Sequence, residues 1–190
     1  MASREGKWVS GTDGNDYRHR QKIASQYYES SLYKSRLRMS IFLHFLLFLL
    51  MALKLSENIL NQFAITIQEL KNMNIPKPHL WEWIWTVSLV FAFIGLSGAR
   101  RNRSSLMQIY VTGTFLFGLF PIFWAAVYFL EDVINIALNR NSTEIDKWFG
   151  YPVAVVWYIF ITIAFQVHIF SMYFAIKLIK VWDIKSTKKT

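Results

Sequence analysis

The sequence of 190 residues contains no cysteine. This absence excludes disulfide bonds, thiolate metal sites, palmitoylation and cysteine nucleophiles together. Acidic residues are also few, with 12 Asp and Glu against 21 Lys and Arg, and none lies in the middle of a long apolar run. Because proton and ion pathways normally place carboxylates at mid-depth in the membrane, this distribution argues against such a pathway.

Motifs of catalysis are missing as well. The chain has no HExxH, no GxSxG, no Walker-type loop and no glycine-rich dinucleotide turn. The histidines are spread over different segments: His19, His44, His79 and His168. We therefore expect no enzyme activity, no cofactor and no metal site.

What the sequence does contain is four long apolar runs, at residues 39–53, 81–99, 106–130 and 151–176. A bilayer core of ~30 Å needs about 20 helical residues, and lipid offers no hydrogen-bond partner to a bare backbone. The first run has only 15 residues before Lys54, so we expect the stem of Lys54 to snorkel and the span to reach residue 58. The sequence predicts an all-α membrane protein, a bundle of four transmembrane helices over residues 39–180.

Basic residues predict how this bundle is oriented. The N-terminal tail, residues 1–38, holds eight Lys and Arg, and we expect it to be partly disordered. The connection after the second run holds three, and the segment after residue 176 holds five. That segment ends in a basic tail at 181–190. The other two loops hold five in total. The positive-inside rule then places both termini and the second loop in the cytoplasm. Their expected partner is the anionic cytoplasmic lipid surface, rather than nucleic acid.

The third loop, lumenal by this count, contains the sequon Asn141-Ser142-Thr143. It makes Asn141 a candidate N-glycosylation site.

Small residues recur at helical spacing within the spans and predict close helix packing. They are Ser88, Ala92 and Gly95 in the second span, Gly118 in the third, and Ala164 and Ser171 in the fourth. Pro121, in mid-span, should distort the third helix. The polar residues inside the spans are His44, Gln166 and His168, and we interpret them as interhelical hydrogen-bonding groups. The alternative is a small transporter or channel that uses these three side chains.

Short motifs along nearly the whole chain resemble the Jagunal family. They are Met1-Ala2-Ser3-Arg4, Gly11-Thr12-Asp13-Gly14, Asp16, His19-Arg20, His44, Lys54-x-Ser56, Trp81-Glu82, Ser88, Gly95-Leu96, Arg101-Asn102-x-Ser104, Pro121, Gln166-Val167-His168, Tyr173 and Lys177-Leu178. The resemblance implies a four-span protein of the endoplasmic reticulum (ER) with cytosolic termini. It also implies a role in ER organisation and vesicle traffic in the early secretory pathway, without enzymatic activity.

Some members of that family end in a dilysine signal, which the COPI coat reads for retrieval. This chain ends Lys185-Ser186-Thr187-Lys188-Lys189-Thr190, so Lys188 is third from the end but Thr187 stands where the second lysine belongs. Lys185, Lys188 and Lys189 are candidate coat contacts, with a generic basic tail as the competing interpretation. The leading hypothesis is a multi-pass ER protein that acts through its basic cytosolic segments; its oligomeric state is left open.

Overall fold

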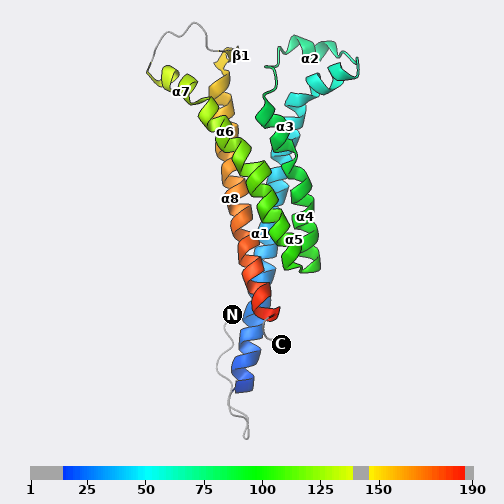
Figure 1. The fold of residues 1–190 in the computed structure, drawn as a ribbon, viewed down its shortest axis with the longest axis vertical. Helices are drawn as coiled ribbons and strands as arrows, with labels where there is room; N and C mark the ends of the chain where they lie inside the picture. The colour runs from blue at the N-terminus through cyan, green and yellow to red at the C-terminus, as the bar shows by residue number, and fades with distance from the viewer. Residues whose placement is uncertain (1–14, 139–145, 187–190) are drawn as a thin grey trace.

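In the computed structural model, which describes residues 15–138 and 146–186, the chain forms an elongated helical bundle (Figure 1). The first span lies in α1 (Asn15–Gln62) and the fourth in α8 (Val153–Ser186). The second is built from α3 (Leu80–Thr86) and α4 (Ser88–Arg101). The third comprises α5 (Ser104–Thr114), the π-helical turn η1 (Phe115–Leu119) and α6 (Phe120–Tyr128).

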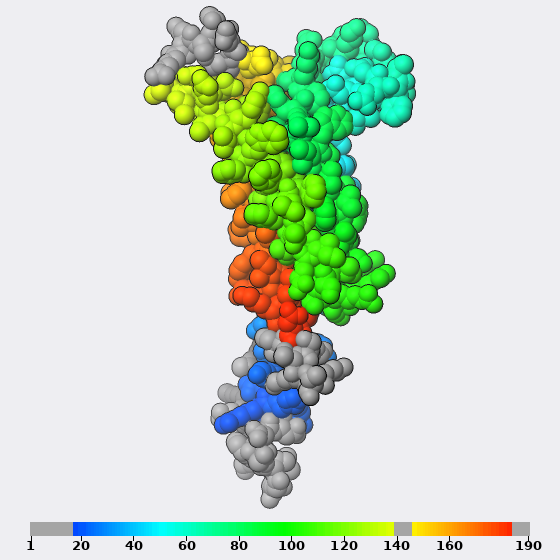
Figure 2. Space-filling model, viewed as in Figure 1, coloured from blue at the N-terminus to red at the C-terminus, as the bar shows by residue number. Residues whose placement is uncertain are grey.

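Short elements cap one end of the bundle. They are α2 (Gln68–Asn72), α7 (Leu130–Ala137) and the antiparallel strands β1 (Lys147–Trp148) and β2 (Tyr151–Pro152). The start of α1, the α4–α5 turn and the end of α8 lie toward the opposite end (Figure 1). In the space-filling view the molecule is a column that widens at the end carrying α2 and α7 (Figure 2).

Within residues 15–138 and 146–186, four helical stretches are long and apolar enough to cross a membrane, which confirms the predicted four-helix membrane fold. The shortest, Leu80–Arg101, has 22 residues. At about 1.5 Å per residue it reaches ~33 Å, enough for a hydrocarbon core of ~30 Å. The outer faces are apolar while several polar side chains are buried, the arrangement expected of a protein whose solvent is lipid.

The helix of the first span is continuous with the preceding tail. Helix α1 has 48 residues, about 72 Å of helix, so its first turns extend beyond the bundle. No Gly or Pro occurs between residues 15 and 62 to interrupt it. Residues 1–14 of the tail that we expect to be partly disordered lie outside the described residues.

The third span is distorted next to Pro121, as predicted. Pro121 has no N–H to donate to the carbonyl of Phe117, and its ring would clash with that carbonyl in a regular α-helix. The turn immediately before it, η1, is π-helical. The fourth span begins at residue 153 rather than 151 because Tyr151 and Pro152 form β2.

Small residues lie where the spans touch. A Cβ built on Gly95 would lie 2.7 Å from the ring of Tyr110, and one on Gly118 would lie 3.1 Å from the ring of His168. The other small residues predicted for packing are buried as well: Ser88, Ala92, Ala164 and Ser171. Helix α1 packs along α8, while α5 packs between α4 and α8.

Candidate functional site

Midway along the bundle, two histidines meet in a buried polar layer. A ring nitrogen of His44, on α1, is 3.0 Å from the hydroxyl of Ser88 on α4. His168, on α8, accepts a hydrogen bond of 3.1 Å at Nε2 from the indole of Trp85 on α3. The two imidazole rings meet edge to face with centroids 4.6 Å apart. Because Nε2 of His168 accepts this bond, it is the unprotonated nitrogen of the ring.

A second polar contact lies one turn further along α8. Ser171 and Tyr110 of α5 share a hydrogen bond between their hydroxyls, and both side chains are buried. Residues three apart on a helix lie on one face, so His168 and Ser171 project from α8 in the same general direction. Together the bonds connect all four spans, which is how polar groups contribute to helix association in lipid. Gln166 is exposed on α8 and does not join this layer.

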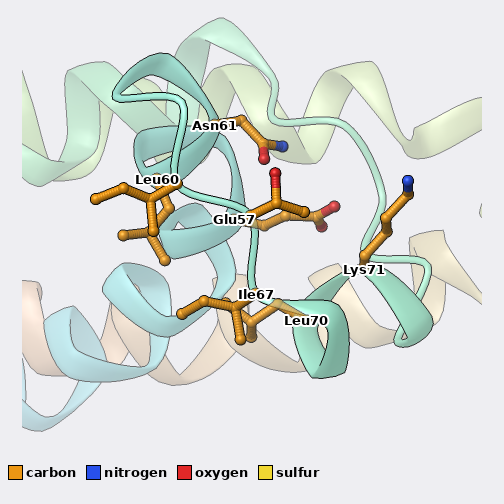
Figure 3. Close-up of a pocket in the computed structure, with 8 residues that line it drawn as sticks. Glu57, Leu60, Asn61, Ile67, Leu70 and Lys71 are labelled. Atoms are coloured by element: carbon orange, nitrogen blue, oxygen red, sulfur yellow. The ribbon is translucent and has the colours of Figure 1, made fainter.

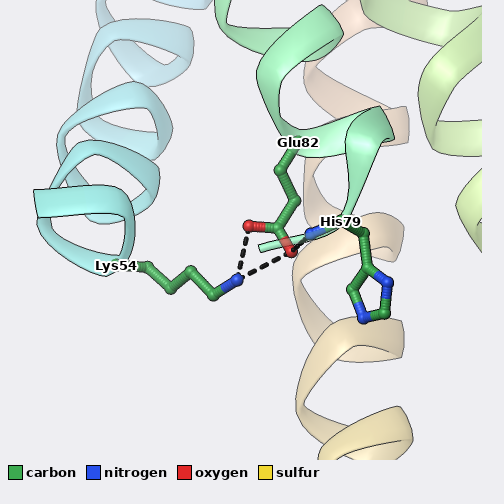
Figure 4. A network of polar contacts seen from close by, with 3 residues as sticks. All are labelled: Lys54, His79 and Glu82. Carbon is green, nitrogen blue, oxygen red and sulfur yellow. Dashed lines mark hydrogen bonds and ion pairs between the residues drawn. The ribbon is translucent and has the colours of Figure 1, made fainter. Parts of the chain in front are cut away.

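Toward the end with α2 and α7, Lys54 and Glu82 form an ion pair inside the bundle (Figure 4). The Lys54 ammonium lies 2.8 and 2.6 Å from the two carboxylate oxygens of Glu82. Oε1 of Glu82 also accepts a bond of 3.0 Å from the backbone N–H of His79, the residue preceding α3. The carboxylate therefore caps the first turn of α3, where the helix dipole favours it.

The expectation that Lys54 snorkels to the membrane surface is wrong. Its side chain is 10% exposed and that of Glu82 is 0% exposed. The ammonium also lies 5.2 Å from the ring centroid of Trp157. The side chain of Lys54 points into the bundle, where its ammonium compensates the buried charge of the Glu82 carboxylate.

Two cavities lie near this end. A cavity of about 180 Å³ lies between the end of α1 and α2, with Glu57 and Asn61 on one side and Lys71 of α2 on the other (Figure 3). An apolar cavity of about 310 Å³ lies between α1 and α8. Neither is lined by His44 or His168. Within the described residues, no group of three or more His, Asp or Glu side chains is placed to hold a metal ion.

At the other end, α1 is tied to α8 just before it leaves the bundle. The indole of Trp182 donates a bond of 3.0 Å to the hydroxyl of Ser30, and the Lys34 ammonium lies 5.8 Å from the same indole ring. In the part of α1 that precedes this contact, Arg18 and Lys22 are exposed. Lys185 belongs to the last turn of α8, while Lys188, Lys189 and Asn141 lie outside the described residues.

Comparison with known proteins decides the family. Residues 1–186 match the family model described as "Jagunal, ER re-organisation during oogenesis". The chain belongs to the Jagunal family. The resemblance predicted from the short motifs is therefore confirmed, and with four candidate spans this is a membrane protein with an ER-related role.

Named Jagunal proteins are similar along the full length. Protein jagunal of Drosophila melanogaster is 42% identical over 194 residues, covering 100% of this chain and 98% of the relative. The Jagunal homolog of Caenorhabditis elegans is 30% identical, covering 96% and 97%. Protein jagunal homolog 1 of Homo sapiens is 26% identical, covering 100% and 98%.

Several residues of the Jagunal motifs are those that make the buried polar contacts: His44, Lys54, Glu82, Ser88 and His168. Sequence reasoning identified each of them but missed the pairing of Lys54 with Glu82. The available signal was that Lys54 and Glu82, which have opposite charges, stand at the ends of the first and second spans on the side predicted to be lumenal. It also missed Trp85 and Tyr110, which in sequence look like any other aromatic residues of a membrane span.

Proposed function

We propose that this Jagunal family protein is a non-enzymatic, multi-pass protein of the ER membrane that supports ER organisation and vesicle-mediated transport in the early secretory pathway. It acts through its basic cytosolic segments. The observation that carries this proposal is charge distribution: 16 of the 21 Lys and Arg residues belong to the two terminal segments and the α4–α5 connection. The described parts of these three segments lie toward one end of the bundle (Figure 1).

In the proposed orientation this basic end is cytosolic, and α2, α7 and the sequon at Asn141 are lumenal. The positive-inside rule supports this choice. Each Lys or Arg near an anionic membrane surface contributes on the order of 1 kcal/mol, so the basic end is suited to contact acidic lipids or an acidic coat surface.

The first turns of α1 carry some of these basic residues beyond the end of the bundle. Asn15 lies 15 residues before Ser30, the residue tied to α8, which corresponds to about 22 Å of helix. Arg18 and Lys22 are carried on this stretch, away from the bundle. Together with Lys185, Lys188 and Lys189 of the C-terminal segment, they are the proposed contacts to lipid headgroups and to coat proteins such as COPI.

We do not favour the alternative of a small transporter or channel that uses His44, His168 and Gln166. The two histidines bond to Ser88 and Trp85 and pack against each other, whereas Gln166 lies outside the layer. A polar layer whose groups bond to one another across the spans supports a role in helix association.

The test is acute depletion followed by synchronised release of a secretory cargo. Exit of the cargo from the ER, the shape of the ER network, and lumenal pH and Ca²⁺ are recorded in the same cells. We expect delayed exit and an altered network with unchanged ion levels, restored by re-expression of the full chain. Normal exit with a shifted ion level would overturn the proposal and favour transport.

A further inference from the structure

The apolar cavity between α1 and α8 is a groove within the part of the bundle that spans the membrane. Leu47, Leu50 and Met51 of α1 form one wall, and Val156, Ile159 and Ile163 of α8 belong to the other. Leu50 and Ile159 are more than half exposed, so the groove is bordered by lipid-facing side chains. In a bilayer an apolar opening of this kind meets lipid chains rather than water.

The length of the groove corresponds to one leaflet. Along α8 the lining extends from Val153 to Ile163, ten helical rises or about 15 Å. The hydrocarbon core is ~30 Å thick, so half of it is also about 15 Å. Its volume of about 310 Å³ suits a single flexible chain.

One end of the groove carries a lysine. Lys54 lines it, together with Pro76 and Trp148 from the two loops at that end. An ammonium has three N–H donors, and the two bonds to Glu82 leave one of them available to another acceptor. Lys77 and Lys147 are exposed and directly follow Pro76 and precede Trp148 in the chain, respectively. Glu82 balances Lys54, and Lys77 and Lys147 exceed the exposed Asp146 by one charge, so the charged residues that line or adjoin this end in the chain carry one net positive charge.

We propose that this groove is a binding site for one phospholipid of the adjacent leaflet, with an acyl chain between α1 and α8 and the phosphate at Lys54, Lys77 and Lys147. The apolar walls match the chain and the basic end matches the phosphate anion. The ligand thus bridges α1 and α8 at the end where α2 and the β1–β2 hairpin are attached. This site is independent of the basic segments at the terminal end.

The test uses the full chain reconstituted in phosphatidylcholine vesicles that contain a trace of phospholipid with a photoreactive acyl chain. After illumination, mass spectrometry maps the adducts. We expect adducts concentrated on residues 47–54 and 153–163. Val156→Trp fills the groove and should abolish them, whereas Val155→Trp, one position away on an exposed part of α8, should leave them unchanged.

If Val156→Trp does not fold, Leu50→Trp blocks the groove from an exposed position on α1, with the exposed Leu53→Trp as its control. The phosphate end is tested by native mass spectrometry of the double variant Lys77→Gln, Lys147→Gln, which should lose co-purified phospholipid. Adducts spread evenly over all lipid-facing surfaces, or labelling unaffected by the filled groove, would refute the proposal. Cross-links to a second copy at these residues would also overturn it, in favour of a protein interface.

Discussion

Replacing one member of the Lys54–Glu82 pair should destabilise the bundle far more than replacing both. Glu82 is fully buried and bonds to the Lys54 ammonium and to the N–H of His79. Removing a single partner leaves the other charge buried without compensation, which costs about 3–5 kcal/mol. We therefore expect Lys54→Met and Glu82→Leu each to lower the free energy of unfolding by about this amount.

The double variant Lys54→Met, Glu82→Leu removes both charges from the interior. Buried ion pairs replaced by apolar residues of similar volume are often neutral or more stable by about 1–4 kcal/mol. Here the lost cap at the start of α3 subtracts about 1 kcal/mol, so the double variant should lie close to the wild type. The coupling energy between the two sites is then about 6–10 kcal/mol, above the roughly 0.5–3 kcal/mol typical of neighbouring residues, because each single variant leaves a buried charge without its partner.

The assay is reversible unfolding in mixed micelles, titrated with a denaturing detergent and followed by helical circular dichroism. Lys71→Met and Glu131→Leu make a matched control, because both side chains are exposed, and each should change the stability by less than about 0.5 kcal/mol. Additive effects at positions 54 and 82, or single variants within about 1 kcal/mol of the wild type, would refute the reasoning.

Variants at three further positions test the packing of the spans by the same unfolding assay. Gly113→Ala should cost about 1–3 kcal/mol, because its Cβ would lie 1.9 Å from the ring of Phe91; full stability would contradict the close approach of α4 and α5. His168→Phe should cost about 1–3 kcal/mol, because it leaves the Trp85 indole without its hydrogen-bond acceptor. In cells this variant should leave lumenal pH unchanged, whereas a transport role would require a shift. Asn102→Val should cost about 1–2 kcal/mol while Asn102→Gly is tolerated, since this residue has φ 53°; equal effects would exclude backbone strain as the cause.

Much of the fold could be predicted because lipid imposes one requirement on every span. Backbone groups must bond internally, so a long apolar run indicates a helix regardless of its neighbours. The distortion before Pro121 is equally local, because it follows from a missing N–H and a ring clash. The continuity of α1 is harder to foresee, since the change from polar to apolar residues near position 38 marks a change of surroundings and not the end of a helix.

The contacts of the polar layer could not be predicted with the same method. Periodicity places His44, Ser88 and His168 inside spans but does not specify which helices face one another. The sequence alone favours the membrane surface for Lys54, because a lone lysine gains hydration there. Its actual position depends on Glu82, 28 residues later in the chain, and on the angle at which α3 enters the bundle. Such pairings are a property of the tertiary structure.

The central claim is that the basic cytosolic segments carry the function, and rescue of depleted cells tests it most directly. One variant replaces Arg18, Lys22, Lys185, Lys188 and Lys189 with Gln. The control replaces Lys71 with Gln, because this exposed lysine of α2 lies at the opposite end and outside the proposed phospholipid site. Exit of a synchronised cargo from the ER is timed for both at matched expression and correct localisation. We predict that the control restores normal exit and that the terminal variant does not. Full rescue by the terminal variant would contradict the account.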